Sequence, residues 1–139
     1  MSLASRLFDL GPRTPVASFA MLLLRLGAGG LMVTQHGWGK LSTFSEKSAT
    51  FPDPLGVGSE LSLALTCLGE VLAPLLIMVG LGTRLAALPA AITMGVAAFV
   101  VHAGDPIGKR ELALVYLLIF LVIGLVGPGR FSVDRKLEG

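Results

Sequence analysis

Charged residues are scarce in this 139-residue chain: they make up only 14% of the sequence, whereas hydrophobic residues make up 53%. The mean hydropathy is +0.80, which is more apolar surface than one soluble core of this size can bury. The composition therefore excludes an ordinary soluble domain and predicts an integral membrane protein whose first partner is the lipid bilayer. The net charge is only +2 and the basic residues are scattered, so no nucleic acid is expected as a partner.

Cysteine is almost absent as well. Cys67 is the single cysteine, which excludes an intrachain disulfide and any CxxC redox or zinc motif. Glycine-rich stretches such as residues 27–30 are followed by no lysine-serine pair, so they are not phosphate-binding loops. The two histidines belong to separate segments and lack the spacing of a metal motif, so no metal site is predicted.

Four apolar segments are long enough to cross a bilayer as helices, which takes about 20 residues. They cover residues 15–36, 60–81, 84–103 and 111–127. Glycine and proline separate them, and we expect Ser59 to cap the second helix and Thr83 to help cap the third. The sequence therefore predicts an all-α integral membrane four-helix bundle, with residues 1–139 forming a single domain.

An even number of spans places both termini on one side of the membrane. Basic residues on the terminal side outnumber acidic ones, whereas the loops on the opposite side mix both signs, so the positive-inside rule predicts cytoplasmic termini. The basic residues on the terminal side are Arg6, Arg13, Arg84, Arg130, Arg135 and Lys136.

Two charged residues lie inside the predicted spans. Arg25 is about ten residues into the first span and Glu70 about ten residues into the second from the other side, so we expect both near the membrane centre. Charges at that depth usually find a partner inside the bundle. We therefore predict an Arg25–Glu70 pair, which either fixes the register of two helices or binds a ligand.

Further polar residues are expected at the outer mouth of the bundle. Helical spacing places His36 on the same face as Arg25, and Lys40, His102 and Glu111 follow at the same end. Donors and titratable groups above a buried polar pair are what a quinone head group requires, which is one hypothesis for this mouth. The alternative is that the histidines are interfacial, with Trp38 and Tyr116 as ordinary packing residues.

The ordered polar and glycine positions resemble those of the DoxX family of small four-helix membrane proteins. The resemblance covers about residues 16 to 135, and its most specific parts are HGWGKL at 36–41 and GPGRFSVD at 127–134. It implies a bacterial inner-membrane protein associated with quinone-linked redox assemblies. The positions that match the polar residues of that pattern, and that are our candidates for ligand binding or proton relay, are Arg25, His36, Lys40, Glu70, His102 and Glu111.

Two functions remain open at this point. The first is a component of a membrane redox assembly that binds a quinone, the one cofactor we consider. The second is a non-enzymatic scaffold or accessory subunit, whose loop at 42–59 meets protein partners in a complex or a homo-oligomer. The sequence does not decide whether the chain has a catalytic activity of its own.

Overall fold

The computed structural model describes residues 2, 3 and 9–139, and within them it is helical without any strand. Arg6, one of the basic residues used for the topology, lies outside the described residues. The elements are α2 (Pro15–Met32), η1 (Val33–Gly37), α3 (Trp38–Ser42), α4 (Phe44–Lys47), α5 (Ser59–Cys67), η2 (Leu68–Leu72), α6 (Ala73–Val79), α7 (Thr83–Val96), η3 (Ala97–Val101), α8 (Ile107–Val126) and α9 (Val133–Leu137).

Three continuous helices in the described part of the chain are long and apolar enough to cross a membrane: Pro15–Ser42, Ser59–Val79 and Thr83–Val101. The first is longer than the predicted span, which stopped at residue 36, because the helix continues without a break through η1 and α3. Helix α8, with 20 residues, is about as long as the second and third of these helices. However, Lys109, Arg110 and Glu111 lie in its first turns and make that end polar.

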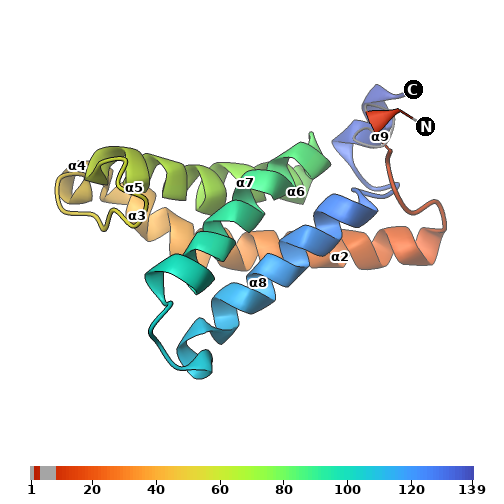
Figure 1. Cartoon of the computed structure of the whole chain (residues 1–139). Helices are drawn as coiled ribbons and strands as arrows, with labels where there is room; N and C mark the ends of the chain where they lie inside the picture. Colours follow the sequence, from red (N-terminus) through yellow and green to blue (C-terminus); the bar gives the residue numbers. More distant parts are fainter. Residues whose placement is uncertain (1, 4–8) are drawn as a thin grey trace.

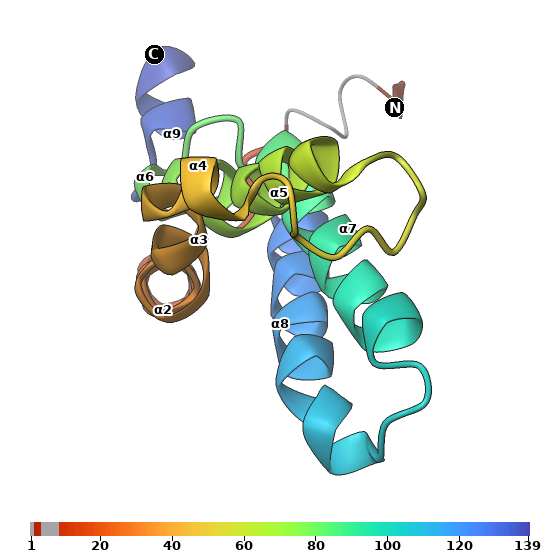
Figure 2. The same ribbon diagram turned by 90° about the vertical axis from the view of Figure 1, so that its left-hand side faces the viewer.

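The helices form two antiparallel hairpins (Figure 1). One hairpin consists of the first helix and the α5–η2–α6 helix, and the other consists of α7–η3 and α8. The hairpins meet where both described ends of the chain lie, which we call the terminus end, and they diverge toward the opposite end, which we call the loop end. Figure 2 shows this divergence: α2 is seen nearly along its axis, whereas α7 and α8 run across the view.

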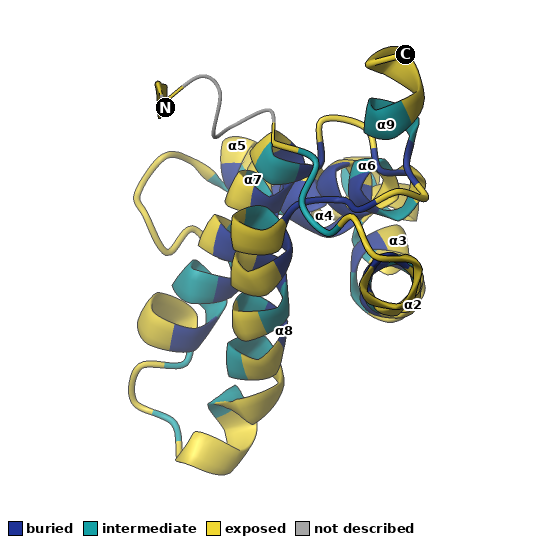
Figure 3. Cartoon of the chain, turned by 90° about the vertical axis from the view of Figure 1, so that its right-hand side faces the viewer, coloured by how far each residue is buried: buried dark blue, intermediate teal, exposed yellow. Residues whose placement is uncertain are grey.

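Small side chains allow the helices to approach closely at the core. Ala86, Ala87, Ala90 and Ala91 are all buried on α7, and a Cβ placed on Gly124 of α8 would meet the Ala87 methyl group at 3.3 Å. The small residues of the third span are therefore a packing face. Figure 3 shows the buried positions gathered where the hairpins cross, while the loop-end parts of α7 and α8 are largely exposed.

Large apolar side chains cover the outside of these helices. More than half of the surface of each of the following is exposed: Leu23, Leu31, Leu72, Leu88, Leu118 and Leu125. An exposed apolar surface that extends around several helices is unfavourable in water and suits a hydrocarbon environment. The helices are therefore those of a membrane protein.

Each of three helices is interrupted by one π-helical turn in the described residues: η1, η2 and η3. A π turn inserts one residue into the α-helical ladder, so the residues beyond it rotate relative to the face before it. His36 lies within η1, Glu70 lies within η2, and His102 caps the end of η3. Single π turns are frequent at functional sites, and here they adjoin three of the predicted site residues.

Candidate functional site

Arg25 is completely buried at the terminus end, where its guanidinium group is surrounded by backbone carbonyls. Its Nε donates to the carbonyl oxygen of Ile77 at 2.8 Å, and its Nη2 donates to that of Met78 at 3.0 Å. Its Nη1 donates to the carbonyls of Pro128 at 2.7 Å and Phe131 at 3.0 Å. Arg25 thus joins α2 to the last turn of α6 and to the segment after α8, an arrangement we call the arginine clasp.

The predicted Arg25–Glu70 pair is therefore wrong. Glu70 lies near the middle of the 21-residue helix Ser59–Val79, but Arg25 lies before the middle of the first helix, which is 28 residues long. The prediction ended that helix at residue 36 and so placed Arg25 too deep. In the antiparallel hairpin, Arg25 instead lies level with the carboxyl end of α6, whose free carbonyls carry partial negative charge.

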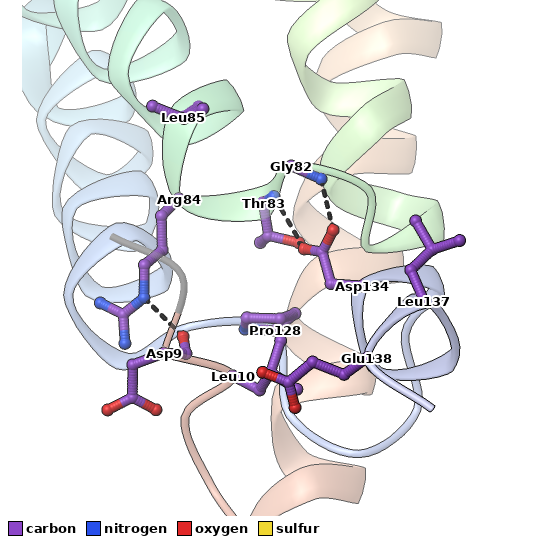
Figure 4. A pocket seen from close by; sticks show the side chains of 10 residues that line it. All are labelled: Asp9, Leu10, Gly82, Thr83, Arg84, Leu85, Pro128, Asp134, Leu137 and Glu138. Atoms are coloured by element: carbon purple, nitrogen blue, oxygen red, sulfur yellow. Dashed lines mark hydrogen bonds between the residues drawn. The ribbon is translucent and has the colours of Figure 1, made fainter. Parts of the chain in front are cut away.

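Asp134 of α9 caps another helix at the terminus end. Its Oδ1 accepts a hydrogen bond from the Gly82 N–H at 2.7 Å, and its Oδ2 accepts from the Thr83 N–H at 3.1 Å and the Thr83 hydroxyl at 3.0 Å (Figure 4). Thr83 is the first residue of α7 and is itself held by Asp134 rather than capping the helix. The carboxylate thereby satisfies the amino end of α7, which begins 51 residues before it in the chain.

Arg84 caps the carboxyl end of α8, as Asp134 caps the amino end of α7. Its guanidinium group donates to the carbonyls of Gly124, Leu125 and Val126, which form the last turn of that helix, at 2.8, 2.6 and 3.1 Å. It also donates to the Asp9 carbonyl at 2.8 Å (Figure 4). The motif GPGRFSVD and two arginines from earlier helices therefore build a hydrogen-bonded terminus end around a small pocket of about 280 Å³ (Figure 4).

The partner of Glu70 is Lys40. The Lys40 Nζ lies 2.5 Å from the Glu70 Oε2, and the two side chains are 28% and 8% exposed. The pair joins α3 to η2, and Gly37 makes the approach possible, because a Cβ there would collide with the Glu70 backbone carbonyl. A carboxylate as buried as that of Glu70 is costly unless it is well paired, and its hydrogen bond from Lys40 is short and direct.

This pair lies in the wall of a cavity of about 570 Å³ between the diverging hairpins, which we call the loop-end cavity. Apolar side chains from every long helix and from the 51–57 loop form most of its lining. The polar residues of its lining are His36, Lys40, Ser62, Thr66, Glu70, Thr93, His102, Lys109 and Tyr116. A large apolar volume with a few convergent polar groups is the usual form of a small-molecule site.

His102 is oriented by a neighbouring carboxylate. Its Nδ1 lies 2.7 Å from the Asp105 Oδ2, and the two side chains are about two-fifths exposed. Lys109 also contributes to this part of the lining. Glu111, which we expected nearby, is exposed and is not among the lining residues. The structure therefore brings together four of the six predicted residues and separates Arg25 and Glu111 from them.

Asp53 holds the 51–57 loop against α5. Its carboxylate accepts hydrogen bonds from the Ser62 hydroxyl at 2.7 Å, the Gly58 N–H at 2.7 Å and the Val57 N–H at 2.9 Å. These bonds, the one from Ser62 foremost, lower the pKa of Asp53 below its ordinary value. Ser59, the cap expected from the sequence, is instead the first residue of α5, and Gly58 occupies the cap position.

The sequence reasoning treated Tyr116 as packing and did not select Thr66 or Thr93, yet all three line the cavity. The Tyr116 ring meets the His36 ring edge-to-face, with centroids 5.7 Å apart. The available signal was the rarity of polar groups: Tyr116 is the single tyrosine of the chain and the one polar side chain in the apolar stretch 112–126.

Taken together, the fold and the cavity define a small helical membrane protein with a polar site between two hairpins. Comparison with known families matches residues 20–103, more than half of the chain, to DoxX. The chain belongs to the DoxX family. The match extends through the first three long helices and ends before α8 and the 127–134 motif. Neither the curated proteins nor the solved structures yielded a match.

Proposed function

We propose that this DoxX protein crosses the bacterial inner membrane four times, with α8 as the fourth span and both termini in the cytoplasm. Support comes from Figure 1, where the two described ends of the chain lie at the same end of the helices. Four spans produce that arrangement and three do not. The charged first turns of α8 would then lie at the interface, where Arg110 bonds to the Ala98 carbonyl at 2.9 Å and its guanidinium lies 5.5 Å from the Phe99 ring centroid.

The loop-end cavity, on this proposal, binds the head group of a quinone as part of a membrane redox assembly. The observation that carries the proposal is the combination of a cavity of about 570 Å³, a mostly apolar lining and a partly buried Lys40–Glu70 pair. A quinone likewise combines apolar and polar parts: its ring and tail are apolar, and its carbonyl oxygens accept hydrogen bonds. Quinones move electrons and protons between membrane enzymes, so a binding site in this chain would link it to such enzymes.

The lining residues suit distinct tasks within this proposal. Lys40 offers N–H donors to a carbonyl oxygen, and Glu70 holds the lysine in place. His36 lies one helical turn before Lys40 in the same wall, and His102 is partly exposed and fixed by Asp105, so these imidazoles can pass protons between the cavity and water. Arg25 and Glu111 take no part, because one is held in the arginine clasp and the other is exposed.

The scaffold alternative draws support from Arg25 alone. All four of its hydrogen bonds go to backbone carbonyls, which is what a residue that only fixes helices would make. The alternative expects the same of Lys40 and Glu70, and hence a cavity without a resident ligand. The two functions therefore differ in what the loop-end cavity contains.

Mass spectrometry of small molecules that purify with the protein in lipid-rich detergent separates the two. We expect a quinone in about equimolar amount with the wild type, and its loss in Glu70→Gln and in Lys40→Met. Removing Lys40 leaves Glu70 buried without a partner, so Lys40→Met should also lower the free energy of unfolding, by about 1–3 kcal/mol. Glu70→Gln should cost less, because an amide oxygen still accepts from Lys40.

Matched controls are Glu60→Gln and Lys47→Met, since both residues are exposed and neither lines the cavity. Both should retain the ligand. A wild-type protein that carries no quinone, and takes none up when a short-chain benzoquinone is added, would contradict the proposal. In that case, destabilised Lys40 and Glu70 variants would favour the scaffold.

A further inference from the structure

Tyr116 is a second feature of the loop-end cavity that neither the family match nor the ion pair explains. The residue is only 7% exposed. Its ring is fixed by an edge-to-face contact with His36 and by stacking on Phe120, with centroids 5.7 and 6.1 Å away. His36 belongs to the first hairpin and Tyr116 to the second, so their contact spans the wall where the hairpins separate.

The hydroxyl group of Tyr116 has no hydrogen-bond partner among the residues that the structure describes, although its ring is packed on both sides. Buried tyrosine hydroxyls usually have one. Across the described residues, no fully buried side-chain nitrogen or oxygen is left without a partner. The Tyr116 hydroxyl is therefore not sealed inside the protein, and the open space that this residue lines is the loop-end cavity.

Other hydroxyls of the lining differ in this respect. Thr66 Oγ1 donates to the Ser62 carbonyl at 2.8 Å, and Thr93 Oγ1 donates to the Pro89 carbonyl at 2.9 Å. Both protons are committed to the residue's own helix. Tyr116 is thus a rigidly held hydroxyl with its proton free, beside the His36 ring, whose nitrogens likewise make no hydrogen bond within the described chain.

Resting on the proposed function, we infer that the Tyr116 hydroxyl donates a hydrogen bond to a carbonyl oxygen of the bound quinone and thereby selects carbonyl ligands over hydrocarbons. Without an acceptor, this donor is removed from water and unpaired, which penalises a purely apolar occupant. A quinone carbonyl removes that penalty. Selection matters in a membrane, because acyl chains surround the site at far higher concentration than any quinone.

The test compares wild type with Tyr116→Phe, which keeps the ring and removes only the hydroxyl. Two probes are titrated by calorimetry in detergent: a short-chain benzoquinone, and an alkylbenzene with the same tail and no oxygen atoms. We expect Tyr116→Phe to weaken benzoquinone binding by roughly three- to tenfold, the range for one neutral hydrogen bond, and to leave alkylbenzene binding unchanged or slightly stronger.

Thr34→Val is the matched control, because Thr34 does not line the cavity and its hydroxyl proton is already bonded to the Gly30 carbonyl of its own helix, at 2.8 Å. It should leave benzoquinone affinity unchanged. Equal weakening of both probes in Tyr116→Phe would assign the residue a packing role and overturn the inference, as would unchanged benzoquinone binding. If the wild type binds no benzoquinone, the proposed function itself fails, so the two failures are distinguishable.

Discussion

The two ends of the molecule treat polar groups in opposite ways. At the terminus end, Arg25, Arg84 and Asp134 direct every hydrogen bond recorded for their side chains to backbone groups or to Thr83. At the loop end, Lys40 and Glu70 bond to each other beside an open cavity, and Tyr116 leaves its hydroxyl unpaired. A charged residue in a membrane protein is therefore informative about ligands only once its partners are known.

The difference between the two ends also explains why charged residues within the helices serve either structure or ligand binding. Helix ends present unpaired carbonyls and N–H groups, and a side chain that satisfies them is consumed by structure. The middle of a helix has no such groups, so a polar side chain there must bond to another side chain, to water or to a ligand. Glu70 lies at such a level and bonds to the side chain of Lys40, whereas Arg25 meets a helix end.

The largest expected effect that tests this contrast is that of Arg25→Met. The change removes four hydrogen bonds and leaves the Met78, Pro128 and Phe131 carbonyls without a side-chain donor in a largely buried setting, so the free energy of unfolding should fall by on the order of 3 kcal/mol or more. Arg25→Lys should fall between, because an ammonium group lacks the planar fork that reaches both segments. Thermal unfolding in detergent measures both.

Arg13→Met is the control for that substitution, since Arg13 is exposed at the same end of the molecule. It should unfold at the wild-type temperature. If Arg25→Met behaves like this control, the arginine clasp contributes nothing and the proposed difference between the two ends disappears.

A smaller effect is expected for Asp134→Ala. Loss of the carboxylate that caps α7 should cost about 1–2 kcal/mol, as for other helix caps, and Asp134→Asn should cost less because its amide oxygen still accepts. Denaturant or thermal unfolding measures the change. Glu138→Ala provides the comparison, because its ion pair with Arg135 is exposed, with 3.7 Å between the charged atoms. Equal stability of the Asp134 and Glu138 variants would contradict the capping role.

The smallest effect is expected for Asp53, because its hydrogen bonds hold only the 51–57 loop against α5 and join no two long helices. Its pKa is lowered in the folded protein, so its contribution is present above the unfolded pKa of about 3.9 and is lost as the pH falls through the lower folded value. Hydrogen exchange of the Val57 and Gly58 amides should therefore stay protected at pH 4 and lose protection only below it. In Asp53→Ala these amides should exchange freely at neutral pH, while core amides remain protected. Loss of protection at or above the ordinary aspartate pKa would contradict the assigned hydrogen bonds.

Much of the fold could be predicted from the sequence. The helical spans, the αL glycine Gly80 that ends α6 and the small-residue face of α7 all follow from local patterns. The length of the first helix did not, because Gly37 and Gly39 are typical of a helix end and yet the helix continues through both to Ser42. Because the expected first helix was too short, the depth of Arg25 relative to Glu70 was wrong as well. This error produced the predicted Arg25–Glu70 pair.

The site was less accessible for two physical reasons. Every residue supplies a carbonyl, so the partners of Arg25 leave no trace in the side-chain sequence. Each π turn also shifts the faces that lie beyond it, so a regular spacing of 3.6 residues fails where His36 and Glu70 occur. The rarity of polar residues in apolar spans was the better guide, and it would have included Tyr116.

The arginine clasp has a consequence for the order in which the protein is made. The acceptors of Arg25 lie 52, 53, 103 and 106 residues later in the chain. At a synthesis rate of about 5–20 residues per second, the last of them emerges roughly 5–20 s after the arginine itself. During the second half of that interval only the Ile77 and Met78 carbonyls can accept from the arginine, so the closing turn at residues 128–131 completes the clasp. Ribosome-bound chains that stop before residue 128 would therefore lack half of the hydrogen bonds that hold Arg25 in the finished protein.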